Sequence, residues 1–97
     1  MAQVIFSAEA LADLERLAEF LFDQAPDSAP GMIETVMAAT AVLANHPLVG
    51  RRVEAEIREL VISRGNSGYL GLYVFDAAYD VVRILRIRHQ PETGYRE

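Results

Sequence analysis

The chain contains no cysteine and no lysine, and it has no apolar run long enough to cross a membrane. Without cysteine, a disulfide framework, a thiolate zinc site and a thiol nucleophile are excluded. A membrane helix needs about 20 consecutive apolar residues, and the N-terminus lacks the basic region and apolar run of a signal peptide. The two histidines are too far apart for a metal motif. We therefore expect a cytoplasmic protein without a metal or other cofactor.

A length of 97 residues leaves room for one domain, 1–97, with its own core. Hydrophobic residues make up 52% of the chain, which excludes a disordered protein. The net charge of −5 argues against a protein that coats itself in nucleic acid. The charges are uneven, because up to Pro47 the only basic side chain, leaving histidine aside, is Arg16 against seven carboxylates, whereas eight arginines and seven carboxylates follow. Exclusive use of arginine suits ion pairs and interfaces, although codon bias explains it equally well.

The N-terminal half begins with a predicted strand and helix. Val4–Phe6 is a short apolar run, and Ser7 is a good N-cap for a helix over about 8–24. The expected buried stripe at helical spacing consists of Leu11, Leu14, Ala18, Leu21 and Phe22. Leu17 and Phe20 fall outside this stripe. The helix is thus apolar on more than one face, which indicates either further packing or a partner.

A second helix follows the Pro- and Gly-containing break at 25–31. Its expected stripe consists of Ile33, Val36, Met37, Thr40, Leu43 and Ala44. Asn45-His46-Pro47 ends it. Because the connection between the two helices is short, we predict an antiparallel helical hairpin.

The second half of the chain predicts three strands, at Ile57–Ile62, Tyr69–Phe75 and Val81–Arg88. They should form an antiparallel meander, with Val4–Phe6 as a fourth strand. In Tyr69–Phe75 both alternate rows are apolar, so both faces of that strand should be covered at times. The order β-α-α-β-β-β predicts an α+β fold, a helical hairpin packed on a small, twisted antiparallel sheet.

Four short motifs then match a known family in order and in placement. They are P-L-V-G-R at 47–51, R-E-L at 58–60, Gly68-Tyr69 followed by Tyr73, and I-L-R-I-R-H at 84–89. From about Ile5 to His89 the chain therefore resembles the RelE/ParE superfamily of type II toxin–antitoxin toxins.

The resemblance implies a toxin that a cognate ParD- or RelB-like antitoxin holds inactive in a hetero-oligomer. RelE-type members are ribosome-dependent mRNA endonucleases. ParE-type members are non-enzymatic poisons of DNA gyrase that block replication. Neither type implies a small-molecule substrate, a cofactor or a membrane partner.

The sequence departs from the nuclease pattern at two positions. RelE-type members tend to carry arginine where this chain has Leu70, and basic residues where it has Gln90. RNA cleavage without a metal needs a base, an acid and a cation near the phosphate, and these two residues supply none of them. The departures favour a ParE-type gyrase poison with no catalytic residues. An mRNA endonuclease and a toxin that has lost its activity remain alternatives.

We predict two binding regions. In the first, an amphipathic helix of the antitoxin lies in a groove on the helical hairpin, against Leu14, Leu17, Phe20, Leu21, Met32 and Met37. The second, for the target or the antitoxin, consists of Arg58, Arg86, Arg88, His89 and Tyr95. Arg86, Arg88 and 89–97 should matter for toxicity more than for folding.

Each assignment has a structural alternative. Leu17 and Phe20 could instead pack under the N-terminal strand or the C-terminal tail. Arg58 could fix the preceding turn, and the other arginines could pair with nearby carboxylates. His89 and Tyr95 are the nearest approach to an acid–base pair, although a tail tyrosine is more often a packing or interface residue.

Overall fold

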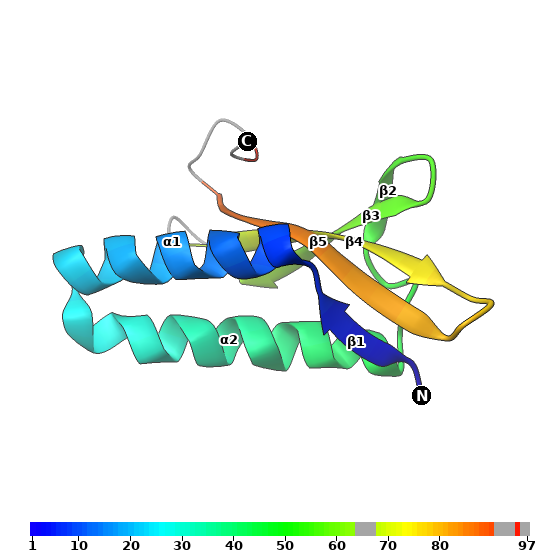
Figure 1. Cartoon of the computed structure of the whole chain (residues 1–97), viewed down its shortest axis with the longest axis horizontal. Helices are drawn as coiled ribbons and strands as arrows, with labels where there is room; N and C mark the ends of the chain where they lie inside the picture. Colours follow the sequence, from blue (N-terminus) through cyan, green and yellow to red (C-terminus); the bar gives the residue numbers. More distant parts are fainter. Residues whose placement is uncertain (64–67, 91–94, 96–97) are drawn as a thin grey trace.

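The computed structural model describes residues 1–63, 68–90 and 95, and shows a helical hairpin on one face of a twisted sheet (Figure 1). The elements are β1 (Gln3–Phe6), α1 (Ala8–Gln24), α2 (Ala29–Ala41), β2 (Arg51–Glu54), β3 (Ile57–Ser63), β4 (Tyr69–Asp76) and β5 (Val81–His89). Short 3-10 turns, η1 (Pro26–Ser28) and η2 (Val42–Ala44), flank α2. The predicted α+β architecture is confirmed. No helix among these residues is long and apolar enough to span a membrane.

The sheet differs from the prediction in two respects. Its five strands lie in the order β1-β5-β4-β3-β2, and β1 pairs with β5 in parallel, so the sheet is mixed rather than antiparallel. Alternation of apolar residues shows which face of a strand is buried but not the direction in which it runs. The edge strand β2 was not predicted, because all four of its residues are exposed and three are charged. It therefore lacks the alternation by which a strand is recognised.

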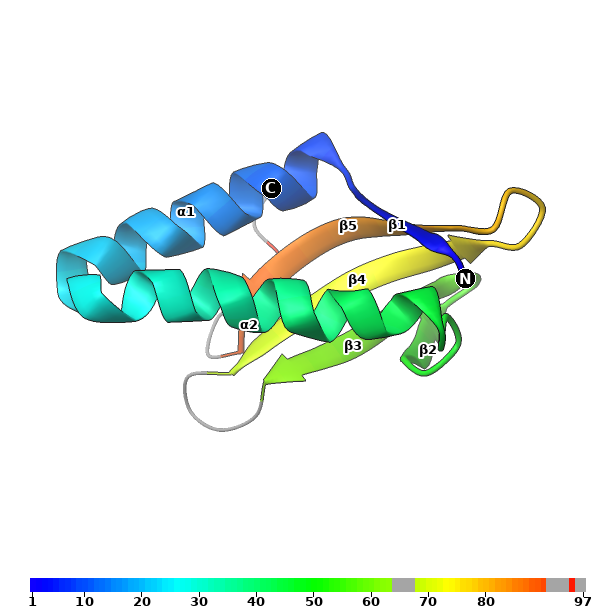
Figure 2. The same cartoon turned by 90° about the horizontal axis from the view of Figure 1, so that it is seen from below.

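The two helices sit differently on the sheet. Figure 2 shows α2 crossing the sheet and α1 running beside β5. Ser7 fixes the start of α1, because its hydroxyl accepts the Ala10 N–H at 3.0 Å and donates to the Leu85 carbonyl at 2.9 Å. One side chain therefore caps the helix, as predicted, and also ties it to β5.

α1 buries a different face from the predicted one. Leu17 is 5% exposed and lies in the core beside Ala10, whereas Leu11 and Phe22 are 54% and 63% exposed. The predicted stripe and the observed buried face share three partly buried residues, Leu14, Ala18 and Leu21. The helix is apolar over a wide arc, so two overlapping stripes fit the same spacing, and only packing against the sheet selects between them.

α2 shows the same ambiguity. The buried residues that the sequence predicted are Val36, Thr40 and Leu43. Met32 is also buried, at 5% exposure, while Ile33 and Met37 are exposed on the side away from the core. The stripe is therefore rotated toward Met32 relative to the predicted one.

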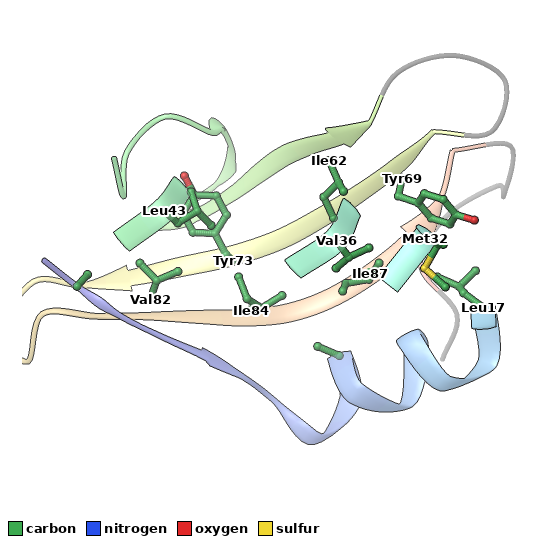
Figure 3. Packing of buried hydrophobic residues seen from close by; sticks show 12 residues of the cluster. Leu17, Met32, Val36, Leu43, Ile62, Tyr69, Tyr73, Val82, Ile84 and Ile87 are labelled. Carbon is green, nitrogen blue, oxygen red and sulfur yellow. The ribbon is translucent and has the colours of Figure 1, made fainter. Parts of the chain in front are cut away.

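The core lies between the helices and the sheet (Figure 3). Its largest fully buried side chains are Tyr73, Leu43, Ile84, Ile87, Val36 and Val82. The Tyr73 hydroxyl accepts the Gly50 N–H at 2.8 Å, which satisfies both groups away from water. A Cβ at Gly50 would lie 2.6 Å from Tyr73 Cε1 and 2.8 Å from the Glu59 carbonyl oxygen. Only glycine fits at this position, so close packing explains the glycine of the P-x-x-G-R turn.

The two apolar rows of β4 lie on opposite faces, as predicted. The row that joins or packs against the core consists of Tyr69, Tyr73 and Phe75. The other row, Leu70, Leu72 and Val74, lies on the face turned away from the helices, which we call the outer face. A register shift opposite Leu72 and Tyr73, whose partners on β5 are Arg86 and Ile84, lets both Ile84 and Ile87 enter the core.

Candidate functional site

The outer face carries arginines beside the second apolar row. The β5 residues on this face are Arg83, Arg86 and Arg88, and their partners on β4 are Val74, Leu72 and Leu70. The prediction that Arg86 and Arg88 share a face is thus confirmed by the register.

Tyr95 lies across the outer face between β3 and β5. Its hydroxyl donates a 2.9 Å hydrogen bond to Glu59 Oε2, and the Arg88 guanidinium lies 5.2 Å from its ring centroid. Leu70 belongs to the strand between these partners and is only 7% exposed, although it points away from the helices. Burial and the Glu59 carboxylate raise the pKa of the Tyr95 hydroxyl, so it stays protonated. The tail residue therefore covers part of the second apolar row.

Arg86 holds α1 against β5. Its Nε and Nη2 donate to Asp13 at 2.8 and 3.2 Å, and the Ile87 N–H donates to the same carboxylate at 2.9 Å. The pairing of β1 with β5 ends at Phe6 and Ile84, so Asp13 takes over as acceptor along the open edge of β5. This contact makes Arg86 part of the fold, and its role in toxicity stays a prediction.

Arg58 is also bound by its own chain. Its Nη1 donates to the carbonyls of Leu48 and Gly50 at 3.1 and 2.8 Å. These bonds shape the turn that precedes β2. The geometry supports the alternative in which Arg58 fixes the turn, rather than a binding role.

His89 and Tyr95 do not face each other. The His89 ring packs on Tyr69, with centroids 5.1 Å apart, whereas Tyr95 contacts Arg88 and Glu59. Neighbouring residues of a strand point to opposite faces, and Arg88 and His89 do so here. The acid–base pair that the sequence suggested is therefore not assembled.

The predicted antitoxin groove is only partly a surface. Leu17 and Met32 are each 5% exposed and lie in the core, so in this structure they do not line an exposed groove. Leu14 and Leu21 are partly buried against the core, while Phe20 and Met37 are 59% and 49% exposed. Because α1 is apolar over a wide arc, the sequence does not show which leucine turns toward the core.

A cleft of about 370 Å³ opens instead at the end of the hairpin where α1 meets α2. Its lining residues are Ala18, Glu19, Phe22, Ala29, Pro30 and Ile33. Phe20 is not among them, because it lies two positions from Phe22 and so points to another side of the helix. The sequence assigned Ala18, Phe22 and Ile33 to the core, so it missed the cleft. The sequence feature that could have indicated the cleft is the position of these residues at the edge of the apolar arc of each helix.

The family model for the ParE toxin of the type II toxin–antitoxin system parDE matches residues 4–93. The chain belongs to this toxin family. Toxin RelE3 of Caulobacter vibrioides is 37% identical over 93 residues, covering 95% of this chain and 98% of that protein. Toxin RelE2 of the same organism is 36% identical over 89 residues, covering 92% and 96%. The predicted membership of the RelE/ParE superfamily is confirmed.

Solved structures agree with this toxin fold. The toxin–antitoxin complex RelBE2 from Mycobacterium tuberculosis contains a chain with 28% identity and a TM-score of 0.63, over 92% of this chain and 98% of that one. A chain of the chromosomal ParDE system from P. aeruginosa has a TM-score of 0.65 at 20% identity, over 92% and 96%. The second likeness concerns the fold alone.

Among residues 1–63, 68–90 and 95 no group of three or more His, Asp or Glu side chains is placed to hold a metal ion. Leu70, which stands where the resemblance leads one to expect an arginine in RelE-type members, is apolar and 7% exposed. Apart from Tyr95, the tail residues 91–97 lie outside the described residues.

Proposed function

We propose that this toxin is neutralised by a cognate ParD- or RelB-like antitoxin and acts, once released, by binding DNA gyrase without catalysis. The match to a family model named for ParE over residues 4–93 supports this branch. The chain's net charge of −5 also argues against a protein whose target is ribosomal RNA.

The observation that carries the proposal is Leu70. Metal-free cleavage of RNA needs a cation beside the phosphate and a proton acceptor near the attacking hydroxyl. Leu70 offers neither, and Tyr95, which lies over the same part of the sheet, donates a hydrogen bond to Glu59. A neutral tyrosine that already donates to a carboxylate is a poor general base. A surface of this composition is suited to binding.

We propose Arg88, His89 and Tyr95 as the end of the sheet that meets the target. Arg83, which is exposed on the same outer face, extends this region. Arg58 and Arg86 are left out, because their guanidinium groups are bound within the fold.

The second candidate function is mRNA cleavage on the ribosome. One observation favours it: the two curated relatives, at 37% and 36% identity, carry RelE names. In that case Arg88 would supply the cation near the phosphate, and the tail would have to move away from Glu59.

One experiment separates the two functions. The toxin is induced without antitoxin, and DNA breaks and transcript ends are scored in the same culture. We expect linear DNA to accumulate in a gyrase cleavage assay with purified toxin, and primer extension to show no new transcript ends. Ribosome-dependent cuts at codon-phased positions, with no linear DNA at any toxin concentration, would replace the proposal with the nuclease.

A further inference from the structure

The outer face of the sheet carries a carboxylate that is almost buried. Glu59 lies opposite Leu72 of β4 and Arg51 of β2, and residues that lie opposite each other in a ladder share a face. The Glu59 side chain is only 10% exposed. Its Oε1 accepts from Arg51 Nη2 at 3.0 Å, and its Oε2 accepts from the Tyr95 hydroxyl at 2.9 Å. A carboxylate beside an apolar row is tolerated because these two donors replace its water.

Three of the family motifs are linked through this carboxylate. Arg51 closes P-L-V-G-R, Glu59 is the central residue of R-E-L, and Arg88 belongs to I-L-R-I-R-H. Arg51 holds Glu59, which in turn holds the Tyr95 hydroxyl. The Arg88 guanidinium lies 5.2 Å from the centroid of the Tyr95 ring. The target-binding region proposed above includes Arg88 and Tyr95 but gives no role to the carboxylate.

Stability alone is a weak reason for this arrangement. The Arg51 side chain is 74% exposed, and ion pairs at exposed sites contribute little to stability. On β3 the Glu59 side chain shares its face with Ile57 and Val61, where an apolar side chain would pack without a desolvation cost. Tyr95 belongs to no helix or strand, so no backbone ladder holds it on the sheet. A fixed carboxylate that accepts from the hydroxyl is suited to hold this ring in one orientation.

We propose that Glu59 is a positioning residue for the target-binding region. Arg51 fixes the direction of the carboxylate, which holds the Tyr95 ring. The ring in turn orients the Arg88 guanidinium, through the attraction between a cation and an aromatic face. Neither Glu59 nor Arg51 has to touch the target. The inference rests on the proposed role of Arg88 and Tyr95, and its two readouts, growth arrest and the environment of the Tyr95 hydroxyl, are recorded in the same way whichever target the toxin has.

NMR spectra of the full-length toxin test the link between the carboxylate and the tail. With isotope-labelled tyrosine Cζ, the signal of Tyr95 is the one that Tyr95→Phe removes. Glu59→Gln, which takes away the charge, should shift this signal, and Arg51→Gln, which lets the carboxylate turn, should shift it as well. Glu56→Gln is the matched control, because Glu56 is an 86% exposed carboxylate of the same hairpin that lies 3.7 Å from Arg52. A Tyr95 signal that stays in place in Glu59→Gln, or moves as much in Glu56→Gln, would overturn the proposal.

A double-variant cycle in growth arrest separates positioning from stability. The toxin variants are induced without antitoxin, and the inducer concentration that halves the colony count is recorded, with immunoblots to verify equal accumulation. Glu59→Ala and Tyr95→Phe should each raise this concentration roughly tenfold, the scale on which members of one hydrogen-bond network couple. The double variant should need no more inducer than either single variant, because without the hydroxyl there is nothing for the carboxylate to hold.

A conservative replacement completes the test. Glu59→Gln keeps an oxygen that accepts from the Tyr95 hydroxyl, so it should retain part of the toxicity that Glu59→Ala loses. Circular dichroism melts verify that each variant is folded, and Glu59→Gln replaces Glu59→Ala in the cycle if the latter is not. Losses that multiply in the double variant, or full toxicity in Glu59→Ala, would refute the positioning role. Growth arrest without linear DNA in the gyrase assay would refute the proposed target and leave this inference standing, whereas a wild-type toxin that arrests no growth would refute both.

Discussion

The helical hairpin and the outer face of the sheet use charge in opposite ways. On the outer face, Arg86 is held by Asp13, and Arg51 is held by Glu59 at 3.0 Å. On the hairpin, the carboxylates beside the cleft have no cation among the described residues. Removing one partner of a buried pair such as Asp13–Arg86 costs stability, whereas an exposed carboxylate contributes little to the fold and is available to a partner. The comparison separates residues of the fold from residues of an interface.

The largest effect should come from the buried carboxylate on which the fold depends. Asp13→Ala leaves the Arg86 guanidinium and the Ile87 N–H without their acceptor, and we expect a loss of about 3 kcal/mol in unfolding free energy. Urea denaturation measures it. Glu15→Ala, one half-turn along the same helix but exposed, should change stability by less than about 0.5 kcal/mol. Equal losses from both variants would erase the distinction between bound and available charges.

The cleft should matter for binding and not for folding. Phe22→Ala should weaken the complex with the antitoxin by about 2 kcal/mol, as buried aromatic anchors do, with little change in the Tm of the free toxin. Phe20→Ala is the matched control, because Phe20 is similarly exposed but does not line the cleft. Calorimetric titration of both variants checks this. If Phe20→Ala proved the more damaging of the two, the antitoxin would lie on the other side of α1.

A smaller loss is expected at the turn that joins the two regions. Tyr73→Phe removes the hydroxyl that accepts the Gly50 N–H and leaves that donor buried, which should cost about 1.5 kcal/mol of stability. Tyr79→Phe, at a residue 77% exposed, should have no measurable effect. Thermal melts of the two variants give the comparison, and an unchanged Tm for Tyr73→Phe would show that water replaces the hydroxyl.

The smallest effect concerns the tail. Tyr95→Phe removes the hydrogen bond to Glu59 and should lower stability at neutral pH by about 0.5 kcal/mol. Because the pKa of the Tyr95 hydroxyl is raised above its ordinary value of 10.0, the unfolded chain ionises first as the pH rises. Stability from this group is thus complete below about pH 10 and is lost above it.

The alkaline limb of a denaturation series against pH tests this sign. Tyr95→Phe should flatten the loss of stability above about pH 10, since phenylalanine cannot ionise. Tyr73, whose pKa burial also raises, contributes to the same limb and is still present in that variant. An unchanged limb in Tyr95→Phe would mean that Tyr95 is not held at Glu59 in solution.

Several parts of the fold followed from local patterns. Ser7 predicted the start of α1, the turn residues between 25 and 31 predicted the hairpin, and the two apolar rows of β4 predicted that both its faces are covered. These features rest on the preferences of single residues and on the period of a helix or strand. The exposure of the residues on the two helices was predicted less well, because it depends on which part of an apolar arc faces the sheet. For this reason Leu17, which was predicted outside the buried stripe, lies in the core, whereas Phe22, which was predicted within it, is exposed.

The sequence alone determined the order of every helix and strand except β2, the family and the acidic character of the first half of the chain, since each follows from residue type and spacing. The tertiary structure decided the direction of β1, the existence of β2, and the partners of the charged groups. Asp13 and Arg86 are 73 residues apart in the chain, and Glu59 and Tyr95 are 36 apart. No local pattern connects such residues. The docking of α1 beside β5 brings Asp13 to Arg86, and the pairing of β3 with β4 places Glu59 on the face where Tyr95 lies.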